Sequence, residues 1–316
     1  EGEEVAPRQP YPTHVPSLLA QQISADDVFG LIPFWERSAC RAQGAAARND
    51  GLYTPPSTQG SIVFPMTGGG VNWGGAAFDP VNQVLYANVS RAIHIVKLLP
   101  RAAVPDGFNP PPGHDFGRQQ GAPFAMTRAV ALSPLGLPCN KPPWGEMVAV
   151  DLKAGKILWR SRVGTTEDRA PFGIAFPLGT PLVNGVAITA SGLAFTGAMD
   201  AYLRAFDARS GQELWQGRLP VPGVANPMTY LWKGEQYVAI GAGGHSESGT
   251  TSGDSVVAFR LARPGEAPSL RSRTFDRPGG RFMSGAIAVG FAIVLMAVLL
   301  WRWRRRRVGR EGGIAI

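Results

Sequence analysis

The chain has 316 residues, of which 44% are hydrophobic and 17% are charged, and it contains 40 glycines and 28 prolines. So many turn-forming residues with so few charges favour an all-β protein over a helical or a disordered chain. The net charge is +8, but six arginines between positions 302 and 310 supply most of it, so the charge does not indicate a nucleic-acid partner.

Residues 1–51 are predicted to form a proline-rich, extended lead-in followed by two short helices. Ser24 followed by two aspartates is a helix N-cap signal, and residues 34–49 favour a second helix that ends before an Asp-Gly pair. The chain begins without a signal-peptide pattern, which favours a mature product, a fragment or one piece of a split polypeptide.

A repeated unit of short strands predicts a partial β-propeller over residues 52–263. Its clearest copy lies within residues 191–220, which read as three strands joined by tight turns. An Asp, a Gly and a Trp recur in two copies of the unit at a constant offset of 56 residues, namely Asp151, Gly155 and Trp159, then Asp207, Gly211 and Trp215. The alternative is two unrelated hairpins that share a common turn.

The first predicted blade runs from Gly75 to Trp159. A long Pro- and Gly-rich insertion at residues 100–143 interrupts it, and no strands are predicted there. An additional strand is predicted before this blade, at residues 61–64.

The second predicted blade ends at Trp215, and the third has three strands and lacks an outer one. The strands of the third blade are expected at residues 225–230, 236–240 and 255–261. Known propellers close with about four to eight blades, so these cannot close a ring. The remaining blades must come from another chain, from self-association or from polypeptide that is absent here.

The C-terminal part predicts a membrane anchor. Residues 264–281 read as a linker, and residues 282–301 are 20 uncharged, mostly apolar residues, long enough to span a bilayer. We predict a transmembrane helix at 282–303 with the arginine-rich tail, 304–316, in the cytoplasm, because tryptophans and arginines flank one end. The alternative is a buried helix of a globular core.

Few side chains show the spacing of a catalytic or metal site. The four histidines have no metal-ligand spacing, and the glycine-rich segments do not lie between a strand and a helix as a phosphate loop requires. The two cysteines, Cys40 and Cys139, are either disulfide-bonded or two buried thiols.

From residue 52 to 261 the sequence resembles the C-terminal part of the membrane-bound quinoprotein dehydrogenases of the glucose and quinate type. The matching segments are Leu52–Ser57, Asn72–Gly75, Leu135–Cys139, Pro142–Gly145, Gly211–Trp215, Asn226–Tyr230 and Ala242–His245. The resemblance implies an eight-bladed propeller that holds pyrroloquinoline quinone (PQQ) and a calcium or magnesium ion. It also implies oxidation of a sugar or cyclic polyol in the periplasm, with electrons passed to ubiquinone.

The resemblance suggests three site residues. Asn88 matches an asparagine whose amide contacts the quinone, and Asp200 and His245 match an acid and a histidine at the mouth of the family's site. Read without the resemblance, they are a turn asparagine, a strand-turn aspartate and a loop histidine. The chain departs from the family at residues 183–185, where Val-Asn-Gly replaces a Trp or Leu followed by Gly-Gly, which puts a cofactor contact there in doubt.

The family's catalytic base, metal ligands and tryptophan floor fall in earlier blades, and none maps onto this chain. The predicted helix also lies at the C-terminus, whereas the glucose enzymes have N-terminal anchors. Two functions therefore stay open. One is a C-terminal portion or subunit of a PQQ-dependent dehydrogenase that needs the missing blades, in the inner membrane with its propeller in the periplasm. The other is a non-catalytic, membrane-tethered propeller fragment, either a binding or assembly module or a decayed remnant.

Overall fold

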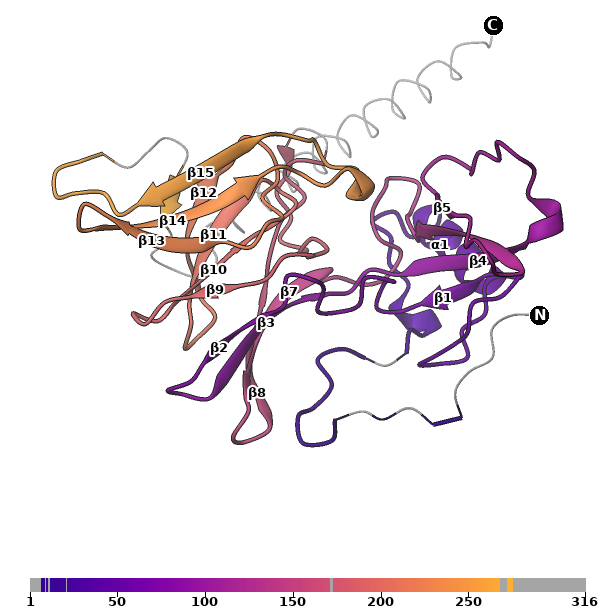
Figure 1. Ribbon diagram of the computed structural model, residues 1–316, viewed down its shortest axis with the longest axis horizontal. Coiled ribbons are helices and arrows are strands. Elements are labelled where there is room, and N and C mark those ends of the chain that lie inside the picture. Colours follow the sequence, from indigo (N-terminus) through magenta and orange to yellow (C-terminus); the bar gives the residue numbers. More distant parts are fainter. Residues whose placement is uncertain are drawn as a thin grey trace, which may run out of the picture.

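The computed structural model is an all-β protein in which three sheets form consecutive propeller blades and a fourth sheet stands beside them (Figure 1). The structure describes residues 7, 8, 10, 12–20, 22–170, 173–267 and 272–274. Within these residues all paired strands are antiparallel and most are joined by short turns, as the sequence predicts.

The helical elements are η1 (Ala25–Asp27), α1 (Glu36–Ala46), η2 (Arg101–Ala103) and η4 (Ser246–Ser248). The strands are β1 (Ser61–Val63), β2 (Ala76–Asp79), β3 (Val84–Ser90), β4 (His94–Pro100), β5 (Asp115–Gly117), β6 (Phe124–Val130), β7 (Gly145–Asp151), β8 (Lys156–Arg162), β9 (Ala187–Ile188), β10 (Leu193–Gly197), β11 (Tyr202–Asp207), β12 (Glu213–Arg218), β13 (Met228–Trp232), β14 (Glu235–Ala242), β15 (Ser255–Arg260) and β16 (Ser272–Thr274). The two predicted N-terminal helices are confirmed as η1 and α1.

The three blades have the strand orders β2-β3-β7-β8, β9-β10-β11-β12 and β13-β14-β15. The partial set of blades, with a three-stranded third blade, is therefore as predicted within the described residues, although β8 and β12 run to Arg162 and Arg218, three residues past the predicted ends of their blades. The short strand β16 pairs with β12 and adds a fifth strand to the second blade. That strand lies in the segment 264–281, which was expected to be only a linker.

The recurring Asp, Gly and Trp each have a structural role. Asp207 Oδ1 accepts the backbone N–H groups of residues 209 and 210 at 2.9 and 2.8 Å, and Asp151 Oδ1 accepts that of residue 154 at 2.8 Å. The glycine that follows adopts a positive φ, 62° at Gly155 and 72° at Gly211, which a side chain would resist. Because the carboxylate closes the turn and the glycine permits it, the motif forms the hairpin in both copies.

The tryptophan of the motif joins one blade to the next. Trp159, on β8 of the first blade, donates its indole N–H to the Ala208 carbonyl at 3.1 Å, and its ring lies against Gly211 in the turn of the second blade. Trp215, at the matching position of the second blade, instead packs edge-on against Phe259 of the third blade, with ring centroids 5.0 Å apart. The Asp-Gly-Trp unit thus links neighbouring blades as well as closing its own turn.

Two apolar cores lie between the blades. The first joins blades one and two and includes Tyr86, Met147 and Phe206. The second joins blades two and three and includes Leu203 and Ile240. Each sheet is therefore covered on the face that meets its neighbour, as stacked repeats require.

The insertion at residues 100–143 is not free of secondary structure, and that prediction was wrong. Strands β5 and β6 lie within it and join β1 and β4 in the fourth sheet, ordered β1-β4-β6-β5. β5 pairs with β6 inside the insertion, but β6 also pairs with β4, and β4 pairs with β1 more than thirty residues upstream, so local patterns could not reveal the whole sheet. Figure 1 shows this sheet and α1 to one side of the three blades.

A disulfide fastens α1 to the end of the insertion. Cys40 and Cys139 are bonded, with their Cα atoms 5.3 Å apart and a sequence separation of 99. The sequence left open whether these cysteines are bonded, and the structure has them bonded. The bond lies in a small core of its own with Ile62 and Ile93 of the fourth sheet region.

The predicted transmembrane helix at 282–303 and the tail at 304–316 lie outside the described residues. Among the residues that are described, no helix is both long enough and apolar enough to cross a bilayer. The membrane anchor therefore stays a prediction.

We expect Gly211→Ala to destabilise the protein by more than Gly192→Ala does. Both glycines have positive φ, 72° and 87°, but a Cβ at Gly211 would lie 2.5 Å from Ser161 Oγ and from the Trp159 ring, whereas a Cβ at Gly192 would meet nothing within 4 Å. Gly192→Ala should cost about 1 kcal/mol for backbone strain. Gly211→Ala should cost a further ~1–3 kcal/mol for overpacking.

Thermal unfolding of the two variants measures this difference, with Gly192→Ala as the control matched in backbone conformation. Equal unfolding temperatures for the two variants would contradict the prediction, because they would mean that a methyl group at position 211 is tolerated beside Trp159.

Candidate functional site

The three blades meet at a backbone junction. A Cβ on Gly74 would lie 2.1 Å from the Gly185 nitrogen, so the two backbones touch where any larger residue would clash. Asn226, which precedes β13 of the third blade, bridges them: its Nδ2 donates to the Gly74 carbonyl at 3.0 Å, and its Oδ1 accepts the Gly185 N–H at 2.6 Å. One side chain thereby connects all three blades.

Asn88, the predicted cofactor contact, lies close to this junction and is buried, with 2% of its surface exposed. Its Nδ2 donates to the Asn184 carbonyl at 2.9 Å, the Gly185 carbonyl at 3.2 Å and Thr196 Oγ1 at 2.7 Å. Its Oδ1 has no hydrogen-bond partner in the described part of the chain. The cofactor contact stays a prediction, and the atom available for it is the carbonyl oxygen rather than the amide nitrogen.

A cavity of about 350 Å³ opens between the blades and the fourth sheet. Its polar lining comes from both sides: Asn72, Thr165, Arg169 and His245 from the blades and their loops, and His94 with Arg128 from strands β4 and β6. Trp73 also lines it and is 63% exposed. Neither Asn88 nor Asp200 reaches this cavity.

Asp200 is a buried ion-pair partner rather than a side chain at the cavity mouth. It is 2% exposed, and both of its carboxylate oxygens accept hydrogen bonds from the Arg204 guanidinium, which is itself buried. Asp200 Oδ2 also accepts the backbone N–H and the hydroxyl of Thr165 at 2.7 and 2.9 Å. Since Thr165 lines the cavity, Asp200 contacts the cavity wall through that residue.

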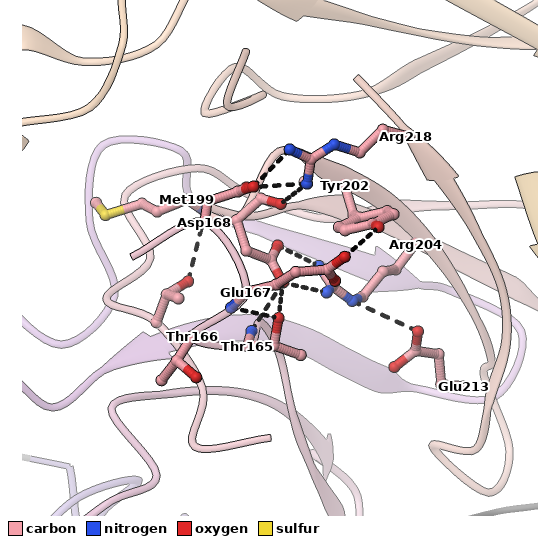
Figure 2. A network of polar contacts seen from close by, with 12 residues as sticks. Thr165, Thr166, Glu167, Asp168, Met199, Tyr202, Arg204, Glu213 and Arg218 are labelled. Atoms are coloured by element: carbon pink, nitrogen blue, oxygen red, sulfur yellow. Dashed lines mark hydrogen bonds and ion pairs between the residues drawn. The ribbon is translucent and has the colours of Figure 1, made fainter. Parts of the chain in front are cut away.

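Figure 2 shows the polar network around this ion pair. Arg204 Nε also lies 3.4 Å from Glu213 Oε1. Burial alone would lower the pKa of Arg204, but the carboxylates of Asp200 and Glu213 outweigh it and raise that pKa, so the guanidinium stays charged. A second arginine, Arg218, binds Asp168 and donates to the Asp200 carbonyl at 3.0 Å. The loop that carries Thr165 is therefore fixed from two directions.

His245, the third predicted residue, does line the cavity. Its backbone N–H donates to Thr250 Oγ1 at 2.6 Å, and its Nδ1 lies 3.2 Å from Ser248 Oγ. The structure thus puts His245 in the cavity wall with Thr165, while Asp200 lies behind Thr165. Of the three predicted residues, only His245 is exposed to the cavity.

The fourth sheet contributes a chain of hydrogen bonds that the sequence did not reveal. Arg128 Nε donates to Asp115 Oδ2 at 2.8 Å, and Arg128 Nη1 donates to Thr67 Oγ1 at 3.2 Å. The Thr67 hydroxyl lies 2.8 Å from His94 Nδ1, which also accepts the Thr67 backbone N–H at 3.3 Å. His94 had been noted only as one of four histidines without metal-ligand spacing.

These contacts fix the protonation of His94. Because Nδ1 accepts a backbone N–H, the neutral ring carries its proton on Nε2. Burial, and then the charge of Arg128, lower the pKa of His94 to about 4, although Asp115 opposes the shift. At neutral pH the ring is therefore an uncharged Nε2–H donor.

The resemblance implies PQQ and a metal ion, and the described residues offer polar groups for the first but no ligand cluster for the second. No group of three or more His, Cys, Asp or Glu side chains that could hold a metal occurs among them. Donors that suit a ligand rich in oxygen acceptors are present in the cavity, at His94 and Arg169, and Asn88 Oδ1 is an unused buried acceptor.

Comparison with known proteins gives consistent matches. The family model described as "PQQ: Glucose/ethanol/alcohol dehydrogenase, beta-propeller domain" matches residues 1–238. Quinoprotein glucose dehydrogenase of Escherichia coli (strain K12) is 39% identical over 272 residues, 83% of this chain and 34% of that protein. Probable quinate dehydrogenase (quinone) of Xanthomonas campestris pv. juglandis is 40% identical over 271 residues, 82% of this chain and 34% of that protein.

A more distant relative is the glycerol dehydrogenase large subunit of Gluconobacter oxydans (strain 621H), 33% identical over 279 residues, which are 82% of this chain and 37% of that protein. The chain spans about a third of the length of the curated relatives that it matches.

We expect the imidazole of His94 to stay neutral, with its proton on Nε2, down to about pH 5, because its pKa is lowered to about 4. The unfolded chain, with an ordinary histidine pKa near about 6.5, binds that proton first, so the contribution of His94 to stability is lost as pH falls from about 6.5 towards 4. Long-range ¹H–¹⁵N spectra of histidine-labelled protein report the tautomer and its titration. A His94 titration midpoint above pH 6 would contradict the prediction.

Proposed function

Because the chain belongs to the PQQ-dependent glucose/ethanol/alcohol dehydrogenase β-propeller family, we propose that it forms the C-terminal part or subunit of a membrane-bound quinoprotein dehydrogenase. In this proposal the complete enzyme oxidises a CH–OH group of a sugar or cyclic polyol, and ubiquinone receives the electrons. When bound, PQQ accepts two electrons from the substrate carbon. Calcium or magnesium is the proposed metal, with ligands supplied by the missing blades.

The observation that carries this proposal is an incomplete fan of blades. The described third blade has β13 and β15 as its edge strands, and Leu231 and Trp232 on β13 are 75% and 53% exposed. Val256 on β15 is 81% exposed. Large apolar side chains that are exposed on a sheet indicate that another layer of protein covers it. The proposed covering is the rest of the propeller, which also completes the cavity beside His245.

Each predicted residue takes a defined role in the proposal. His245 lies at the substrate mouth, on the wall of the 350 Å³ cavity. Asp200 acts indirectly, as a positioning residue that holds Thr165. Asn88 can offer the cofactor only an acceptor, Oδ1, because its Nδ2 is already hydrogen-bonded to the second blade and is not free to donate to a quinone oxygen. The chain's own contribution is therefore to shape and position one side of the site.

The location proposed for the enzyme is the inner membrane, with the propeller in the periplasm and the segment 282–303 as a single span. The support is the sequence: 20 uncharged residues followed by arginines, the pattern of an anchor whose basic end is cytoplasmic. The disulfide is compatible with this placement, because such bonds persist in oxidising compartments.

We expect the isolated chain with PQQ and calcium to be inactive and to self-associate, because its open blade faces are apolar and its described part lacks a metal-ligand cluster. Co-expressed with the earlier blades, it should form a one-to-one complex that reduces a dye with glucose or quinate only when PQQ is added. Light scattering and dye reduction measure the two parts of the prediction.

The control is the complex without PQQ. A monodisperse monomer with a single cooperative melt and no partner would contradict the assembly proposal. It would favour the second function, a non-catalytic, membrane-tethered binding or assembly module.

We expect residues 282–303 to span the membrane with arginines 302–310 inside. Protease added to intact spheroplasts should remove the propeller and leave the tail, and carbonate washing should leave the protein in the membrane. Lysed spheroplasts, in which the tail is also digested, serve as the control. Loss of the tail in intact spheroplasts, or release by carbonate, would overturn the assignment.

A further inference from the structure

His94 is a histidine that the proposed function has not used, although it lines the cavity from the fourth sheet. Within the described residues its Nδ1 has two hydrogen-bond contacts, both to Thr67, and its Nε2 has none. The ring is well packed, and burial is the main cause of its lowered pKa. His94 is half-buried in the cavity wall, and Nε2 is its ring atom left to bind a ligand, because a ligand that excludes water from a donor must itself accept that donor's hydrogen bond.

The side chains behind His94 determine whether Nε2 donates or accepts a hydrogen bond. Arg128 can only donate, and it donates to Thr67 Oγ1, so the Thr67 hydroxyl hydrogen is left for His94 Nδ1. The Arg128 charge is balanced by Asp115, 2.8 Å from its Nε. This series of hydrogen bonds runs from Asp115 through Arg128 and Thr67 to His94, and it leaves His94 Nε2 as an uncharged N–H donor. The donors and acceptors cannot exchange roles while Thr67 donates its backbone N–H to Nδ1.

We propose that His94 is a substrate-binding residue that donates its Nε2–H to a hydroxyl oxygen of the polyol substrate. This inference rests on the proposed function and deepens it, since it assigns recognition of a polyol hydroxyl to the fourth sheet rather than to the blades. A neutral donor suits a neutral hydroxyl, because binding leaves no buried charge unpaired. Arg128 and Thr67 are positioning residues, because they act on the substrate only through His94.

Two substitutions separate binding from a structural role. In His94→Asn, the Asn Oδ1 can replace Nδ1 as the acceptor for Thr67, while the donor at the Nε2 position is lost. In His94→Gln, the side-chain amide can replace the Nε2–H donor, while the acceptor for Thr67 is lost. His114→Asn is the control, because the His114 side chain hydrogen-bonds only within its own loop and is not part of the cavity wall.

In the assembled enzyme with PQQ, His94→Asn should raise KM for the polyol roughly three- to tenfold, the effect of one lost hydrogen bond, and leave kcat nearly unchanged. His94→Gln should raise KM less, and His114→Asn should not change it. An unchanged KM in His94→Asn would overturn the proposal. A larger KM in His94→Gln than in His94→Asn would also overturn it, because the role would then be to hold Thr67.

A second measurement does not need catalysis. The chain has four histidines, so the Nε2 signal of His94 can be assigned in ¹⁵N-histidine spectra by comparison with His94→Asn. Glucose or quinate added to the protein should shift that signal and leave the His14 signal in place. No shift with either polyol would overturn the proposal. A shift in a complex that oxidises neither polyol would support binding by His94 and refute the proposed function alone.

Discussion

The arrangement of the blades depends on a contact between two backbones. Gly74 and Gly185 approach so closely that a Cβ on either would overlap the other residue's main chain. This contact joins the segments that lead into the first and second blades, and the Asn226 side chain adds the third blade by bonding both backbones. An amide is suited to this position because it offers a donor and an acceptor at once. Asn88 and Asn184 surround the same junction with further amide hydrogen bonds.

A second connection, made by aromatic rings, holds the blades together away from this junction. Trp159 covers the Gly211 turn, and Trp215 packs against Phe259 of the next blade. The polar junction fixes orientation through directional hydrogen bonds, while the rings bury apolar area without strict directionality. Together they make a rigid support, and the loops above it bring Thr165 and His245 to the same cavity.

The features that the sequence predicted are those encoded locally. The Asp207 turn, the positive φ of Gly211 and the tryptophan all lie within one hairpin, so their spacing could be read directly. The fourth sheet could not be predicted, because β1 and β4 pair across more than thirty residues of sequence. Asp200 was assigned to the mouth by resemblance, but a neighbouring arginine and Thr165 hold it in the interior. His94 was missed because its partners come from separate strands and a loop.

The disulfide between Cys40 and Cys139 makes one wall of the cavity dependent on the redox state of its surroundings. The bond closes a covalent ring that contains all four strands of the fourth sheet, and hence His94, together with β2 and β3 of the first blade. In the chain-entropy account, closing a ring of about 100 residues removes unfolded-state freedom worth about 4–5 kcal/mol. Reduction would therefore lower the free energy of local opening for the fourth sheet, while the hydrogen-exchange protection of the second and third blades, whose strands lie outside the ring, would change little. The cavity would loosen on the side of the fourth sheet.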